Sequence, residues 1–202
     1  MLTSISPLGE RARGNRFTVT AAAHVAGSGI GGAAVGAVAG LIGWALLSPL
    51  DRTVASGTAL AVVAVATLAA VALDHVGVPT VHRQVDERWI GAYRGWVYGA
   101  GFGLQLGVGV ITIVPSNVVY AALVGAATTG SPAAGAAVGL VFGVVRGVAV
   151  LLGRRVRTSQ DLARLHRRVA TAAPIASRLT AAGAAGVGGA AAVTALAIGL
   201  LG

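Results

Sequence analysis

The longest uncharged stretch of the chain limits its fold more than any other feature. No Asp, Glu, Lys, Arg or His occurs from Gly95 to Val145. A run of about eighteen apolar residues already suffices for a helix to cross the hydrocarbon core of a bilayer. Only 10% of the 202 residues are charged, against about 25% in soluble domains. The sequence therefore predicts a single integral membrane domain, residues 1–202, with an all-α fold.

Charged segments and Pro-containing turns divide the apolar sequence into about five spans of a polytopic transmembrane helical bundle. The basic N-terminus is 1–16, the interfacial loop is 77–94, and the basic amphipathic segment is 154–178, with Ser159 predicted to cap its helix. The number of spans becomes six if an interfacial or re-entrant helix is included. The predicted spans are 17–47, 53–76, 95–126, 133–153 and 179–201.

The distribution of arginine predicts the orientation. The chain has fifteen Lys or Arg residues, all of them Arg, against six acids. Three Arg residues precede the first span. The four connections between successive spans then contain one, three, none and seven Arg residues, so high and low counts alternate. The positive-inside rule then places the N-terminus in the cytoplasm, and we expect a bacterial inner-membrane protein. Because this bias accounts for the net charge of +9, we expect no nucleic-acid partner.

Three polar residues lie inside the predicted spans at similar depth. By helical rise, His24, Gln105 and Arg146 are all about 11–14 Å from the cytoplasmic boundary. A cation, an amide and an imidazole together suit a small anion or zwitterion, and the imidazole can change charge near neutral pH. The alternative is that Arg146 extends to the headgroups while His24 and Gln105 form interhelical hydrogen bonds.

A proline interrupts the second half of the predicted span 95–126. Pro115 removes a backbone donor and leaves a carbonyl one turn earlier without its helical partner. Thr112, Ser116 and Asn117 can bind the loosened backbone or a passing solute. Interrupted spans of this kind mark binding sites in transporters. A simple structural kink is the alternative.

Glycines recur every four residues in three of the predicted spans. Small residues at this spacing let two helix backbones approach closely. We expect helix packing, with a narrow solute path along the glycine groove as the alternative. The predicted packing positions are Gly32, Gly36, Gly40, Gly99, Gly103, Gly107, Gly135, Gly139, Gly143 and Gly147.

Several chemistries have no support in the sequence. The chain contains no Cys, and therefore no disulfide, thiolate metal site or thiol relay of its own. The glycine-rich stretch 27–32 matches a dinucleotide-binding pattern but lies within a span. Asp74-His75 and the His82, Asp86 and Glu87 group are weak metal candidates. We expect no catalytic residues, no cofactor, no metal site and no enzyme activity.

A shift of 81 residues suggests repeated helical hairpins. It aligns Arg13-Gly14 with Arg94-Gly95 and places His24 opposite Gln105. Chance matches among Gly- and Ala-rich sequences are the alternative explanation.

Two stretches carry a resemblance to a known family. They are GAYRGWVYGAGFGLQLGVGVITIVPSNVVY and GLVFGVVRGVAVLL, at 91–120 and 139–152. Over residues 9–155 the chain resembles the LysE-type exporter superfamily, including its CcdA/DsbD transmembrane branch. The resemblance implies a helical membrane transporter. The chain departs from it in lacking the Cys pair of the thiol-electron branch and in having five predicted spans instead of six.

These observations predict a small transporter or permease subunit for a small polar or anionic solute. Its site would lie between the spans 17–47, 95–126 and 133–153, with Arg146 supplying charge, Gln105 orientation and His24 proton coupling. The alternative is a non-transporting membrane subunit or scaffold that packs against partner helices and docks a soluble protein or anionic lipid. The expected partners are the lipid bilayer, a small-molecule solute, and a partner subunit or second copy of the chain.

Overall fold

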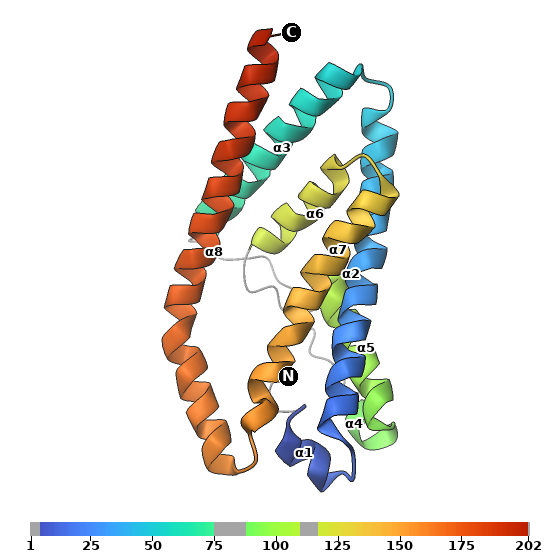
Figure 1. Ribbon diagram of the computed structural model, residues 1–202, viewed down its shortest axis with the longest axis vertical. Helices are drawn as coiled ribbons and strands as arrows, with labels where there is room; N and C mark the ends of the chain where they lie inside the picture. Colours follow the sequence, from blue (N-terminus) through green and yellow to red (C-terminus); the bar gives the residue numbers. More distant parts are fainter. Residues whose placement is uncertain (1–4, 75–87, 110–116, 202) are drawn as a thin grey trace.

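Helices form every regular element in the described part of the chain, which comprises residues 5–74, 88–109 and 117–201 of a computed structural model (Figure 1). The predicted all-α class is thus confirmed. The elements are α1 (Pro7–Ala12), α2 (Phe17–Leu47), α3 (Arg52–Leu73), α4 (Arg88–Ala92), α5 (Gly95–Val108), α6 (Val118–Thr128), α7 (Pro132–Val148), the 3-10 helix η1 (Ala149–Arg155) and α8 (Ser159–Leu201).

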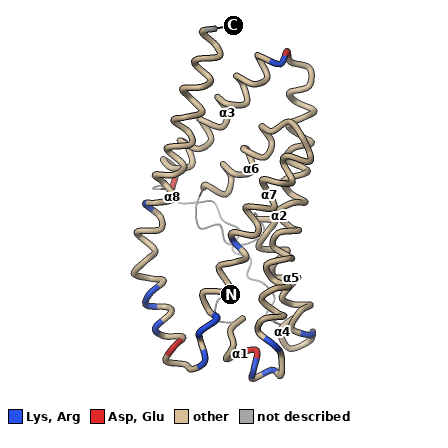
Figure 2. Tube along the Cα trace, viewed as in Figure 1, with Lys and Arg blue, Asp and Glu red and all other residues tan. Residues whose placement is uncertain are grey.

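Among the residues that the structure describes, length and apolar composition mark four helical segments as able to cross a membrane. They are Phe17–Leu47, Arg52–Leu73, Pro132–Arg155 and Ser159–Leu200, and Val118–Thr128 is a shorter apolar helix. A polytopic helical membrane protein is therefore confirmed. Most basic residues lie at the end of the molecule that carries α1 and the start of α8 (Figure 2).

Two predicted segments are divided differently in the structure. The predicted span 95–126 consists of two helices, α5 and α6, separated by residues 109–117. Most of the predicted surface segment 154–178, from Ser159 on, and the predicted span at 179–201 belong to one helix, α8, of 43 residues with Pro174 inside it. The structure also moves the cap of α8 by one residue, because the Thr158 hydroxyl, not Ser159, accepts the hydrogen bond from the Asp161 backbone N–H at 3.1 Å.

The centre of the bundle is α2, which packs most extensively against α7 and α5. The helices α3 and α8 pack against each other as a separate pair. This pair contacts the helices around α2 chiefly through α3 and α6. In Figure 1, α8 runs along one side of the molecule, away from α2 for most of its length.

Glycines form both interfaces of α2. A Cβ atom added at Gly32 would collide with the carbonyl oxygen of Gly139, and one added at Gly139 would collide with that of Gly32. On the α5 side, Gly103 lies against the carbonyl of His24 in the same way. Backbones in contact at this distance leave no room for any side chain. The packing glycines are Gly32, Gly36, Gly40, Gly135, Gly139, Gly143 and Gly147 between α2 and α7, and Gly99, Gly103 and Gly107 between α2 and α5.

Candidate functional site

The end of α5 is the point where three helices meet. Gly109 follows α5 with φ +81°, a conformation that glycine adopts without strain, and its N–H donates to the carbonyl of Leu106 at 3.2 Å. Around the position where a Cβ would stand are Arg146 Nη1 at 3.3 Å and atoms of Phe142 and Val119 at 3.4 Å. Arg146 and Phe142 belong to α7 and Val119 to α6, so the break in the predicted span lies beside the half-buried Arg146.

The Arg146 guanidinium lies against an aromatic ring and near the C-terminal end of α5. It lies 5.3 Å from the ring centroid of Phe142, within the range of a cation–π interaction. Nη1 is sealed from solvent and has no hydrogen-bond partner among the described residues. The nearby C-terminal end of α5 carries partial negative charge, which stabilises a cation there. Arg146 therefore keeps a donor available at the break.

The start of α6 is capped by a residue from another helix. Asp74, directly after α3, accepts a hydrogen bond from the backbone N–H of Asn117 through Oδ1 at 2.6 Å. A carboxylate at a helix N-terminus is favourable because the exposed N–H groups carry partial positive charge. Asn117 itself is 6% exposed, and its Nδ2 has no partner in the described part of the chain.

Asp74 is also one of the weak metal candidates, and in the structure its carboxylate caps α6. Within the described ranges, no group of three His, Cys, Asp or Glu residues is arranged to hold a metal ion. The other residues considered for that site, His75, His82, Asp86 and Glu87, lie outside the described residues.

The predicted polar trio is distributed over three helices. His24 on α2 is 3% exposed, and its Nδ1 has no partner among residues 5–74, 88–109 and 117–201. Gln105 on α5 is half-buried. No hydrogen bond or ion pair joins His24, Gln105 and Arg146, all three of which are described. The predicted Thr112, Pro115 and Ser116 lie in the segment 110–116, outside the described residues.

A small void lies between α2, α5, α6 and α7. Its volume is about 10 Å³, and its lining includes Gly107, Gly139 and Phe142. A void of this size holds about one water molecule. The described arrangement is thus closed to a solute at this position.

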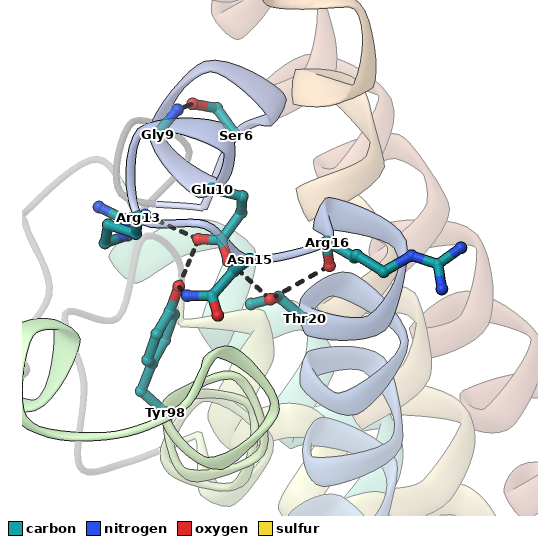
Figure 3. Close-up of polar contacts among 8 residues, drawn as sticks. All are labelled: Ser6, Gly9, Glu10, Arg13, Asn15, Arg16, Thr20 and Tyr98. Carbon is teal, nitrogen blue, oxygen red and sulfur yellow. Dashed lines mark hydrogen bonds and ion pairs between the residues drawn. The ribbon is translucent and has the colours of Figure 1, made fainter.

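A buried carboxylate organises the N-terminal end of the bundle (Figure 3). Glu10 is fully buried, and its two oxygens have partners on α2, on α5 and at Arg13, directly after α1. Thr20 of α2 donates to Oε2 at 2.7 Å, Arg13 Nη2 lies 2.7 Å from Oε1, and the Tyr98 hydroxyl of α5 also donates to Oε1. Asn15 Nδ2 donates to the Tyr98 oxygen at 3.4 Å.

Arg13 is held as a cation by this cluster. Partial burial alone would lower the pKa of Arg13, but the ion pair with Glu10 and the nearby Tyr98 outweigh that effect and raise it. The guanidinium also lies 5.8 Å from the Tyr98 ring centroid.

Sequence reasoning missed this cluster and treated Glu10 and Arg13 only as part of a charged lead-in to the first span. One signal was present, because Glu10 is the only Asp or Glu before Asp51. Its contact with Tyr98 joins residues 88 positions apart, which no local pattern reveals.

Comparisons with known proteins identify a family but no individual relative. No curated protein and no solved structure matches the chain. Residues 6–199 match the family described as "Cytochrome C biogenesis protein transmembrane region". The match covers nearly the whole chain and supports the CcdA/DsbD-like part of the resemblance. The chain belongs to this family of cytochrome c biogenesis transmembrane regions.

Proposed function

We propose that the protein is a small transporter or permease subunit that moves a small solute bearing acceptor oxygens, such as a carboxylate, past Arg146. One observation carries the proposal. Three side-chain nitrogens are buried without a hydrogen-bond partner among the described residues, namely His24 Nδ1, Asn117 Nδ2 and Arg146 Nη1. All three residues belong to the predicted solute-binding set.

Unpaired buried polar groups are costly, typically about 1–3 kcal/mol each. The Asn117 amide and the Arg146 guanidinium are donors, and an anionic oxygen would satisfy both. The His24 nitrogen donates or accepts according to its tautomer and charge, so His24 is the residue we assign to proton coupling. Gln105, with Thr112, Pro115 and Ser116 at the break, would orient the solute.

Because the chain has no cysteine, we propose that the solute is transported without a covalent intermediate. Thiol–disulfide exchange needs a thiolate, and none of the 202 residues is Cys. Passage of an intact solute requires only binding groups and a conformational change that opens the closed void. The broader resemblance to LysE-type exporters favours export. We place the protein in a bacterial inner membrane with its N-terminus in the cytoplasm.

Binding to the purified protein tests this function. Small carboxylates, phosphate and sulfate would be screened one at a time by the shift they cause in the melting temperature in detergent. We expect at least one anion to stabilise the wild type and to lose its effect in Arg146→Gln. Arg178→Gln, which alters an exposed arginine of α8, is the matched control and should respond like the wild type. Equal shifts in all three proteins, or no shift with any anion, would contradict the proposal.

A second candidate function rests on the groove between α3 and α8. This groove has a volume of about 850 Å³ and an almost wholly apolar lining that includes Gly57, Ala61, Ala195 and Gly199. Small residues on two facing helices suit a third helix from another subunit or a second copy of the chain. Extraction in mild detergent followed by mass measurement of the intact complex tests this role, since a monomer without a bound subunit would argue against it.

A further inference from the structure

The short helix α1 lies across the N-terminal end of the bundle. The Leu8 N–H donates to the carbonyl of Val156, just after η1, at 3.2 Å. Ile5, which precedes α1, is 1% exposed and belongs to a hydrophobic cluster with Ala21 of α2, Tyr98 of α5 and Val150 of η1. The segment thus packs against α2, α5 and η1 at this end of the bundle.

Few local interactions hold α1 in place. It has six residues, with Ser6 as its cap, and a helix of that length is not stable alone. Its position depends on the Ile5 contacts and on Glu10, whose carboxylate binds Thr20 of α2 and Tyr98 of α5. A buried carboxylate is tolerated only while such partners remain, so the Glu10 contacts form or break together.

Arg13 pairs with Glu10, but the neighbouring Arg11 and Arg16 do not share this role. Arg11 is exposed on α1. Arg16 contributes its carbonyl oxygen, 3.5 Å from the Thr20 hydroxyl, while its guanidinium points away from the cluster (Figure 3). The charged contact that connects α1 to the bundle therefore centres on Glu10.

We propose that α1 is a plug at this end of the bundle and that the Glu10 carboxylate is the latch that keeps it closed. Release of the latch frees α1 and uncovers Ala21, which precedes the buried His24 by one helical turn on α2. The inference goes beyond the proposed transport function, because a plug can be tested without any solute.

A single introduced cysteine reports the position of the plug, since the natural chain has none. Ala21 is 1% exposed and lies in the same buried cluster as Ile5, so Ala21→Cys should react slowly with a water-soluble maleimide in lipid nanodiscs. Adding Glu10→Ala should speed the reaction by about tenfold or more, because the lost charged hydrogen bonds raise the population of the open state. Glu10→Gln, which keeps the shape and part of the hydrogen bonding, should give a smaller increase.

Two controls keep the test specific. Arg16→Ala in the Ala21→Cys background should leave the rate unchanged. Ala121→Cys, a buried reporter at 7% exposure on α6, should stay slow with Glu10→Ala and so show that the fold is intact.

Three outcomes would overturn the proposal. They are fast labelling of Ala21→Cys with Glu10 intact, no acceleration by Glu10→Ala, and equal acceleration at both reporters, which would make Glu10 a general stabilising residue. None of them bears on anion binding by Arg146, so failure of the plug and failure of the transport proposal are distinguishable.

Discussion

The carboxylate of Asp74 accepts a hydrogen bond from the backbone N–H of Asn117 at 2.6 Å, so the residue that ends α3 also caps α6. The eleven residues of α6 are too few for a stable isolated helix. Packing against α3 and α2, together with this cap, holds α6 in place beyond the break. The orientation of α6 near Arg146 consequently depends on α3.

Replacing Asp74 should destabilise the protein. We expect Asp74→Ala to reduce the free energy of unfolding by about 1–2 kcal/mol, because α6 loses a charged cap. Asp51→Ala is the matched control, since Asp51 precedes α3 but makes no side-chain capping hydrogen bond. Melting temperatures in one detergent provide the measurement. Equal losses in the two variants would refute a capping role for Asp74.

The glycine interface between α2 and α7 should not tolerate a single methyl group. Gly139→Ala places a Cβ against the carbonyl of Gly32 and should cost about 1–3 kcal/mol through forced separation of the helices. At Gly186 of α8 an added Cβ meets no atom within 4 Å. Gly186→Ala should therefore be neutral or stabilising by up to about 1 kcal/mol, because alanine favours helix. Unfolding in mixed detergent measures the stability of both variants. Similar effects of Gly139→Ala and Gly186→Ala would show that the contact between Gly139 and Gly32 is not tight.

Ser28 connects α2 to α7 by a side-chain hydrogen bond. Its hydroxyl is fully buried and donates to the carbonyl of Gly143 at 2.6 Å. We expect Ser28→Ala to cost about 0.5–1.5 kcal/mol, as for other interhelical hydrogen bonds in membranes. Thr194→Ala is the control, because that exposed hydroxyl donates to Ala190 within its own helix. Equal losses of thermal stability in Ser28→Ala and Thr194→Ala would contradict a contribution from the interhelical hydrogen bond of Ser28.

The start of α8 should lose the hydrogen bonds accepted by the Asp161 carboxylate in acid. Asp161, in the basic segment ahead of the predicted span 179–201, accepts hydrogen bonds from the N–H groups of Arg157 and Thr158 at 3.2 and 3.1 Å. Hydrogen bonding by Thr158 and then by Arg157 lowers the pKa of Asp161 below its ordinary value of 3.8. Because the folded pKa is lowered, the ionised carboxylate stabilises the cap above pH 3.8, and this stabilisation is lost as the pH falls through the lowered value.

Hydrogen exchange measures this loss at the two donor amides. After correction for intrinsic rates, protection of the Arg157 and Thr158 amides should fall on acidification in the wild type. Asp161→Asn should show weak protection at every pH. If the protection of these two amides in the wild type does not change with pH, the ionised Asp161 carboxylate does not hold them.

The sequence predicted those features that depend on composition and local spacing. Apolar runs identify membrane helices because burial in lipid needs length and hydrophobicity alone, and glycines four apart identify close helix contacts because they share one face. The division of the predicted span 95–126 required knowledge of where the chain turns, which Pro115 indicates only in part. The Glu10–Tyr98 and Asp74–Asn117 pairs depend on how distant helices are arranged, and each uses side chains that alone look like ordinary loop or interface residues.

The unbroken length of α8 has a mechanical consequence. At about 1.5 Å per residue, 43 residues extend roughly 64 Å, about twice the thickness of a hydrocarbon core. The exposed arginines near one end of α8 and the groove with α3 near its other end therefore lie on one continuous helix. Pro174 is the position at which this helix is most prone to kink. Because both features belong to one helix, the charged end and the α3-facing end of α8 are free to move independently only if the helix bends, and Pro174 lies between them.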